Sequence, residues 1–343
     1  MLVLYNIFGY DTKIMKKYYI ITYGCQMNES DSERLAAKLE KKKYKLTDKI
    51  ESADLIIINT CSVRQSAIDR VYSKIKQFNK LKIKNPKLKI ILTGCILIKD
   101  KRKFEKEVDE IWPIIDFQSE AKHSSKKQAF IPIMTGCNNF CSYCAVPYTR
   151  GREKSRPKKE ILKEIKELIN KKYEKIMLLG QNVNSYKFNF ANLLEEIAKI
   201  KGNFEIRFMT SHPKDMSDEL IKVIKENKKI SKEIHLPIQS GDNTILKKMN
   251  RGYTVGCYKK LIKKIKKEIP KVILSTDIIV GFPGETEKQF QNTVKLVKEI
   301  KFKQIYVARY SPRSGTTASK LKDNIPADEK KKRKRIILDL IKY

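Results

Sequence analysis

Short apolar runs alternate with amphipathic stretches along this chain, and this rhythm limits the fold more than any other feature of the sequence. In the first third, apolar runs at 16–24, 53–60 and 88–94 are separated by helix-like stretches at 30–42 and 65–81. Strands that alternate with helices in this way predict a parallel, Rossmann-like α/β sheet with right-handed crossovers. Ligands of such sheets bind at the carboxyl ends of the strands.

The same rhythm resumes near residue 130 and runs through six further units. Consecutive β/α units predict a partial (β/α)6 TIM-like barrel, open on one side, with its active site at the carboxyl ends of the strands. The expected strands are 130–136, 175–182, 205–211, 233–239, 272–281 and 302–311.

Changes in composition divide the chain into five expected segments. They are a possible N-terminal extension at 1–15, an α/β domain at 16–118, a polar linker at 119–129, the barrel at 130–325 and a basic C-terminal tail at 326–343.

Six of the seven cysteines fall into two trios that resemble metal-ligand sets. Cys137, Cys141 and Cys144 are spaced C-x3-C-x2-C, which suits metal ligation better than a disulfide. Cys25, Cys61 and Cys95 are far apart in sequence, yet each follows an apolar run. Strands of one parallel sheet end on the same edge, so we expect these three thiols to converge.

Two simpler interpretations remain open for these trios. The trio of Cys137, Cys141 and Cys144 could bind zinc, although zinc sites usually pair one C-x2-C motif with a second. Cys25, Cys61 and Cys95 could be buried apolar residues, which is a common role of free cysteine and the one we expect for Cys257.

The C-x3-C-x2-C trio, with Tyr143 before its last cysteine, resembles the radical S-adenosylmethionine superfamily. The words YGCQMNESDSE, NTCSVRQSA and TGC around Cys25, Cys61 and Cys95 resemble the methylthiotransferase family within it. Further words resemble its MiaB-type branch, the tRNA-2-methylthio-N6-dimethylallyladenosine synthases. They are PYTRGREKSRP, LLGQNVNSY, TSHP, HLPIQSGDNTILKKMNRGYT and DIIVGFPGET. The resemblance covers about residues 16 to 340.

This resemblance implies two 4Fe–4S clusters. Cys137, Cys141 and Cys144 would hold the catalytic cluster, whose fourth iron binds S-adenosyl-L-methionine and yields a 5′-deoxyadenosyl radical. The trio of Cys25, Cys61 and Cys95 would hold an auxiliary cluster that carries sulfur for transfer.

Polar residues at the barrel strand ends are the candidates for cofactor binding, and a plain turn or core role is the alternative for each. We expect S-adenosylmethionine to contact Tyr143, Gln181, Asn182, Gln239, Ser240, Gly281 and Glu285. Three arginines of TRGREKSRP are the candidates for RNA phosphate contacts, because their guanidinium groups match phosphate geometry. These are Arg150, Arg152 and Arg156.

The expected reaction converts N6-isopentenyladenosine to its 2-methylthio derivative at tRNA adenosine-37, next to the anticodon. Within the family, the alternatives are threonylcarbamoyladenosine in tRNA and a ribosomal-protein aspartate. An alternative of another class is a non-catalytic iron–sulfur protein that binds RNA.

The net charge of +35, from 74 Lys and Arg against 39 Asp and Glu, suits a polyanionic partner. AT-rich coding DNA is an alternative source of the lysine excess. We expect an anticodon stem-loop as substrate and flavodoxin or ferredoxin as electron donor, while the sulfur donor stays unassigned. Reduced cysteines and the lack of a long apolar run favour a cytoplasmic, monomeric protein without a membrane span.

One departure from the family pattern concerns the C-terminus. The family normally ends in a small RNA-binding β-barrel, the TRAM domain, and this sequence stops where that domain is expected to start. We therefore expect the TRAM domain to be absent from this chain.

Overall fold

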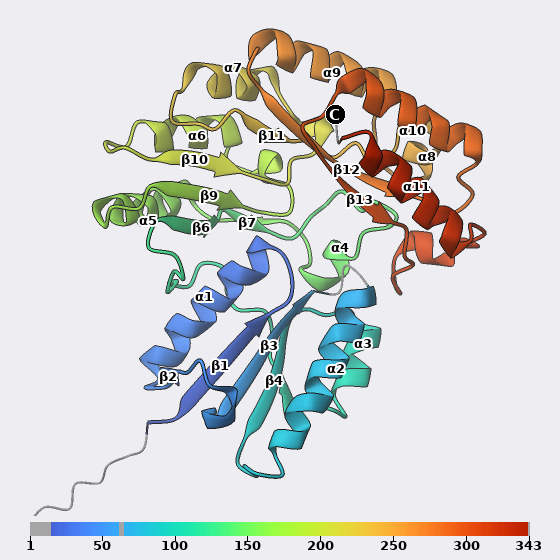
Figure 1. Ribbon diagram of the computed structural model, residues 1–343. Coiled ribbons are helices and arrows are strands. Elements are labelled where there is room, and N and C mark those ends of the chain that lie inside the picture. The colour runs from blue at the N-terminus through green and yellow to red at the C-terminus, as the bar shows by residue number, and fades with distance from the viewer. Residues whose placement is uncertain (1–14, 62–64, 342–343) are drawn as a thin grey trace, which may run out of the picture.

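The first half of the molecule is a five-stranded parallel sheet in a computed structural model that describes residues 15–61 and 65–341 (Figure 1). The strand order is β2-β1-β3-β4-β5, and every pair in it is parallel. Its elements are β1 (Lys17–Thr22), α1 (Gln26–Lys41), β2 (Lys45–Leu46), β3 (Leu55–Cys61), α2 (Gln65–Leu81), β4 (Lys89–Cys95), α3 (Ile98–Phe104) and β5 (Glu110–Ile111).

Helices cover both faces of this sheet, as its continuous apolar strands require. Ile56 and Ile58 of β3 pack with α2 and α3, whereas Leu55 and Ile57 pack with α1. Successive side chains of a strand point to opposite faces, so one apolar run serves two cores. The carboxyl ends of β1, β3 and β4 point toward the second half of the molecule (Figure 1).

The second half is a partial barrel of parallel strands with helices outside. Two three-stranded ladders, β10-β9-β6 and β11-β12-β13, are joined by the bridge between Ile206 and Ile230. No ladder joins β13 to β6 within the described ranges, which leaves that side open. The elements are β6 (Gln128–Pro132), β7 (Met134–Thr135), α4 (Val146–Thr149), β8 (Lys154–Ser155), α5 (Lys158–Asn170), β9 (Lys175–Leu179), α6 (Phe190–Ala198), β10 (Glu205–Phe208), α7 (Asp218–Glu226), β11 (Glu233–His235), α8 (Asn243–Lys248), α9 (Val255–Glu268), β12 (Ile273–Val280), α10 (Glu287–Ile300), β13 (Gln304–Arg309) and α11 (Ala327–Asp339).

The predicted fold class is confirmed: a parallel α/β sheet precedes a (β/α)6 barrel. The sequence did not reveal the two-residue strands β2, β5, β7 and β8, which are too short to show a pattern. The boundaries of the five segments stay a prediction, and the possible extension at 1–15 lies almost wholly outside the described residues.

The predicted tail and linker both pack on the rest of the molecule. The basic C-terminal segment forms α11, which packs against β12, β13 and α10. The linker is attached to α1, because His123 lies 3.0 Å from a Glu33 oxygen and Ser124 N–H donates to the same carboxylate at 2.8 Å. His123 therefore has a structural contact.

A buried charge cluster joins α1 to the barrel. The Glu164 carboxylate on α5 accepts from Arg34 at 3.2 Å and from Arg156 at 2.6 Å. The Arg34 side chain has no exposed surface, and that of Arg156 is 4% exposed. One carboxylate thus pairs with two buried cations at the joint between the halves.

Glu164→Ala should destabilise the protein by about 3–5 kcal/mol, because it leaves two buried guanidinium groups without their carboxylate. Urea denaturation measures this loss. Lys163→Ala, at the exposed neighbouring position on α5, is the control and should change stability by no more than about 0.5 kcal/mol. Equal effects of the two substitutions would contradict the role of the cluster.

Candidate functional site

The first candidate site lies at the carboxyl edge of the N-terminal sheet. Cys61 and Cys95 end adjacent strands and pair directly in register, while Cys25 follows β1 and caps the N-terminus of α1. Asn28 holds this edge together, because its amide donates to Asn59 at 3.0 Å and lies 3.4 Å from the Cys25 sulfur. The parallel sheet therefore brings three distant thiols to one edge, as the strand pattern predicts.

An arginine from the barrel completes this edge. Arg150 Nε donates to Cys95 Sγ at 3.0 Å, and Arg150 Nη2 donates to Asp31 at 2.5 Å. A hydrogen bond with Cys61 and the Arg150 charge lower the pKa of Cys95 to about 6, although burial opposes the shift. The structure therefore stabilises the Cys95 thiolate, which is the form that ligates metals.

The second trio lies in a loop that leaves the first barrel strand. Gly136 has φ of +78°, and a Cβ there would collide with the Arg152 backbone, so only glycine fits this turn. Gln181 at the end of the next strand accepts from Gly136 N–H at 2.6 Å. Ser142 N–H and Oγ–H donate to carbonyls at the end of α8. These contacts fix the loop that carries Cys137, Cys141 and Cys144.

A buried arginine also faces this second trio. Arg251 donates to Cys141 Sγ at 3.2 Å and to the Pro237 carbonyl at 2.8 Å, and its Nε donates to the Tyr253 hydroxyl at 2.9 Å. The sequence analysis missed Arg251 as a site residue, although it lies in the word MNRGYT. Each trio therefore has a guanidinium group in direct contact with one of its sulfur atoms.

Both trios fit the ligand chemistry of iron–sulfur clusters, which bind through cysteine sulfur. Burial raises the pKa of Cys144 to about 12, so that thiol stays protonated until a cation binds it. Among the described residues, no group of three His, Cys, Asp or Glu side chains is arranged around a single metal ion. A cubane cluster does not require such an arrangement, because each cysteine binds a different iron atom.

A cavity of about 730 Å³ opens beside the loop of Cys137, Cys141 and Cys144. It is bordered by Tyr143 and Cys144 from the thiol loop and by Gln239 from a barrel strand end. On the other side it reaches Gln65, the first residue of α2, whose side chain accepts from Arg313 at 2.6 Å. The cavity therefore touches the N-terminal half at Gln65, and Cys25, Cys61 and Cys95 lie outside its lining.

Of the predicted cofactor contacts, Tyr143 and Gln239 line this cavity, and five others lie outside its lining. Gln181 supports the thiol loop, and Asn182 donates to Asp215 at 2.7 Å. Ser240 is buried and accepts from Asp242 N–H at 3.2 Å. A direct cofactor contact of these residues stays a prediction.

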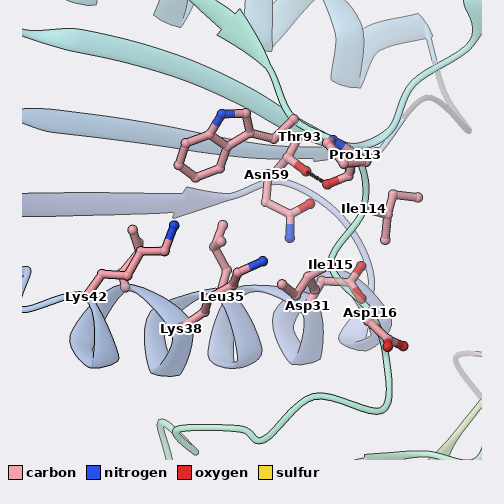
Figure 2. Close-up of a pocket in the computed structure, with 13 residues that line it drawn as sticks. Asp31, Leu35, Lys38, Lys42, Asn59, Thr93, Pro113, Ile114, Ile115 and Asp116 are labelled. Carbon is pink, nitrogen blue, oxygen red and sulfur yellow. Dashed lines mark hydrogen bonds between the residues drawn. The ribbon is translucent and has the colours of Figure 1, made fainter.

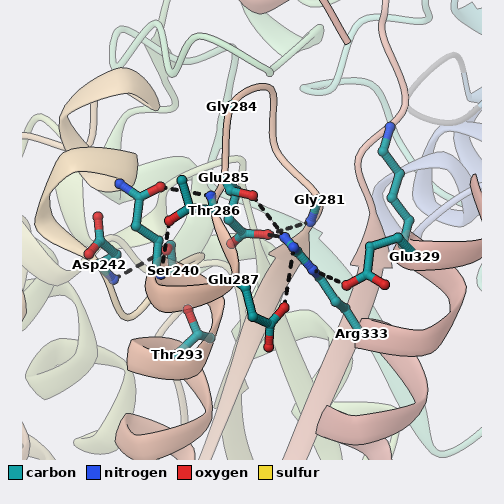
Figure 3. A network of polar contacts seen from close by, with 12 residues as sticks. Ser240, Asp242, Gly281, Gly284, Glu285, Thr286, Glu287, Thr293, Glu329 and Arg333 are labelled. Carbon is teal, nitrogen blue, oxygen red and sulfur yellow. Dashed lines mark hydrogen bonds and ion pairs between the residues drawn. The ribbon is translucent and has the colours of Figure 1, made fainter. Parts of the chain in front are cut away.

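Gly281 and Glu285 belong to a polar network with α11 (Figure 3). Glu285 accepts from Gly281 N–H at 2.7 Å and from Arg333 at 3.0 Å, and Arg333 also pairs with Glu287 and Glu329. Gly281 has φ of +70°, and a Cβ there would collide with Lys330. Glu285 therefore shapes the glycine turn, and its role in cofactor binding stays a prediction.

Two of the three arginines predicted to contact phosphate have other partners. The Arg150 side chain is 2% exposed and bound to Asp31, and that of Arg156 is 4% exposed and bound to Glu164. We therefore replace the predicted phosphate contacts of both with structural roles. Arg152 is exposed and lies over the Phe140 ring, so its prediction stands untested.

Cys257 was expected to be buried, and this prediction is wrong because it lies exposed on α9. Its helical position did not reveal which face of α9 it occupies.

A second, smaller cavity of about 320 Å³ lies within the N-terminal half (Figure 2). Leu35 and Trp112 contribute apolar surface, and Asp31, Asn59 and Gly94 approach it from the side of the first trio. Asp31 therefore borders this cavity and also holds Arg150.

Known families and relatives match both halves of the chain. The Radical SAM superfamily matches residues 131–297, and a family described as Uncharacterized protein family UPF0004 matches residues 17–116. A tRNA-2-methylthio-N(6)-dimethylallyladenosine synthase of Carboxydothermus hydrogenoformans is 43% identical over 367 residues, covering 95% of this chain and 83% of the relative. The synthase of the same name from Thermoanaerobacter pseudethanolicus is 43% identical over 363 residues, covering 94% and 77%.

Solved structures share the fold at low identity. The radical S-adenosylmethionine methyltransferase TsrM from Kitasatospora setae has a TM-score of 0.62 at 12% identity, covering 85% of this chain and 73% of that one. The cobalamin-dependent radical enzyme OxsB has a TM-score of 0.61 at 12% identity, covering 95% and 56%.

The barrel with its C-x3-C-x2-C loop thus defines a radical S-adenosylmethionine fold. With relatives at 43% identity across nearly its whole length, the chain belongs to the family of tRNA-2-methylthio-N(6)-dimethylallyladenosine synthases. Separately, within the described ranges no helix is both long and apolar enough to cross a membrane.

His212, at the end of β10, generates a pH prediction. Burial, followed by the charges of Arg251 and Lys214, lowers its pKa to about 2. The unfolded chain therefore binds one more proton below about pH 6.5, and folding stability falls as the pH drops below that value.

His212→Gln should remove this dependence, which amounts to at most about 1.4 kcal/mol for each pH unit. The measurement is the free energy of unfolding of both apo proteins at pH 7, 6 and 5. Parallel pH profiles for wild type and variant would contradict a neutral, buried His212.

Proposed function

We propose that this protein is a radical S-adenosylmethionine tRNA methylthiotransferase. It converts N6-isopentenyladenosine at tRNA position 37 to 2-methylthio-N6-isopentenyladenosine. The observation that carries the proposal is the presence of two cysteine trios, one gathered at the carboxyl edge of the N-terminal sheet and one in the loop beside a cavity of about 730 Å³. The substrate is inferred from the activity for which relatives that are 43% identical over about 95% of the chain are named.

Cys137, Cys141 and Cys144 hold a 4Fe–4S cluster in this proposal, and Cys25, Cys61 and Cys95 hold an auxiliary one. With S-adenosylmethionine bound, the first cluster would supply a radical able to remove hydrogen from adenine C2, the auxiliary cluster would supply the sulfur, and a further S-adenosylmethionine would supply the methyl group. Adenine C2–H is too weakly acidic for a carboxylate or imidazole base, which is why a radical cofactor is required.

The chain's own residues position these groups. Gln181 and Ser142 fix the thiol loop, and Arg251 places a cation against Cys141. Tyr143 and Gln239 border the cavity, where Tyr143 offers an aromatic face to a purine. Tyr306 and Tyr310 extend this aromatic lining and limit the water beside the reacting base.

Substrate RNA binds through exposed cations of the thiol loop and of α11 in this proposal. These cations are Arg152 of the thiol loop and Lys331, Lys332 and Arg335 on α11, which are exposed and do not belong to the Glu285 network. A net charge of +35 attracts an anticodon stem-loop from a distance. Flavodoxin or ferredoxin supplies electrons to the monomeric enzyme in the cytoplasm, and the sulfur donor stays unassigned.

Expression of this protein in bacteria that lack their own synthase should restore 2-methylthio-N6-isopentenyladenosine in tRNA. Mass spectrometry of tRNA nucleosides measures the product. A methylthio group on threonylcarbamoyladenosine alone, or on a ribosomal-protein aspartate, would replace the proposed substrate. No methylthio product together with no 5′-deoxyadenosine would favour a non-catalytic RNA-binding protein.

Single cysteine substitutions should separate the two sites. Cys141→Ala should abolish formation of 5′-deoxyadenosine from S-adenosylmethionine and dithionite. Cys61→Ala should retain that cleavage but form no methylthio product, and each variant should lose about half of the roughly eight irons that two clusters contain. Cys257→Ala, at the exposed cysteine, is the matched control and should behave as wild type.

A further inference from the structure

Arg150 belongs to the barrel by sequence but to the N-terminal thiol site by contact. It caps the C-terminus of α4, six positions after Cys144. Its guanidinium group nevertheless contacts Cys95 Sγ at 3.0 Å and Asp31 at 2.5 Å, both in the other half of the molecule. The side chain is only 2% exposed, so this placement is fixed rather than incidental.

The pair formed by Arg150 and Asp31 leaves hydrogen-bonding capacity unused. Arg150 Nη1 and Asp31 Oδ1 are both buried, and neither has a hydrogen-bond partner among the described residues. Buried polar groups are nearly always paired, so an unpaired guanidinium nitrogen beside three thiols indicates a missing acceptor. Sulfur in an iron–sulfur cluster is anionic and accepts hydrogen bonds.

We propose that Arg150 is a positioning residue for the auxiliary site, and that its free Nη1–H group donates to an anionic sulfur bound there. This inference rests on the proposed function, since it assumes that Cys25, Cys61 and Cys95 hold a cluster. The sulfur is either a sulfide of that cluster or an additional sulfur atom attached to it. Asp31 keeps the guanidinium plane oriented toward the thiols.

Because Arg150 comes from the barrel loop, its contact with Cys95 also links the two cysteine sites. Gly151 O accepts from Cys137 N–H at 3.2 Å, so the residue after Arg150 is tied to the radical loop. Arg150 therefore connects the backbone of one cluster site to the sulfur ligands of the other. Correct folding of the radical loop places the cation at the auxiliary site.

A cation that donates a hydrogen bond to cluster sulfur stabilises the reduced, more negative cluster and raises its reduction potential. The auxiliary site can be observed alone in a full-length variant that carries Cys137→Ala, Cys141→Ala and Cys144→Ala. In this background, Arg150→Gln should lower the midpoint potential of the remaining cluster, measured by redox titration with EPR detection. Arg150→Lys should lower the midpoint potential by a smaller amount, because lysine keeps the charge but not the planar fork.

Two further variants separate positioning from general damage. Arg152→Gln changes an exposed arginine of the same loop and should leave the potential unchanged. Arg150→Gln combined with Asp31→Asn removes both buried charges at once, which preserves folding, and should show the same lowered potential. A potential that equals that of the background in both Arg150→Gln proteins would overturn the proposal.

The titration is run with and without added sodium sulfide to identify the sulfur. If Arg150→Gln lowers the potential before sulfide is added, the contact is with cluster sulfide. If it lowers the potential only after sulfide is added, the contact is with the additional sulfur atom. The outcome is distinguishable from failure of the proposed function. If the variant with the three alanine substitutions binds no 4Fe–4S cluster, the auxiliary cluster is absent and both proposals fail. If it binds a cluster whose potential does not change with Arg150→Gln, only this proposal fails.

Discussion

Buried ion pairs between the two halves are the constraint on which the candidate site depends. Arg34 pairs with Glu164, Arg150 with Asp31 and Arg313 with Asp100, and all three arginine side chains are at most 3% exposed. Separating the halves would expose or unpair these charges, and an unpaired buried charge costs several kcal/mol. Because the pairs surround the carboxyl edge of the N-terminal sheet, they also fix the separation of the two cysteine trios.

Most of the fold follows from the sequence because the β/α rhythm is a local property. Parallel topology then determines where strand ends meet, so Cys25, Cys61 and Cys95 could be brought together without any knowledge of packing. The register between β3 and β4 sets Cys61 beside Cys95 at the ends of two adjacent strands. The thiol loop could also be predicted from the sequence, since its three cysteines lie within eight residues.

The charged residues of the site could not be assigned in this way. Arg150 and Asp31 are 119 positions apart, and a motif that contains arginines does not indicate whether they face solvent or a carboxylate in another domain. The same limit applies to α11, whose basic composition does not indicate which of its cations are buried. Lys330 and Arg333 are buried there because Asp323 and Glu285 neutralise them. Exposed charge and paired charge have the same sequence signature.

The arrangement of the two trios also limits how the reaction can proceed. In the proposed reaction, a radical formed near Cys144 reacts with whatever lies beside it, so the target carbon must already be close to the sulfur that will replace its hydrogen. The cavity already reaches from Cys144 to Gln65 of the N-terminal half. A hinge between the halves would have to break the pair between Arg313 and Asp100, which is buried and 2.7 Å long. The structure therefore favours a rigid joint between the two halves.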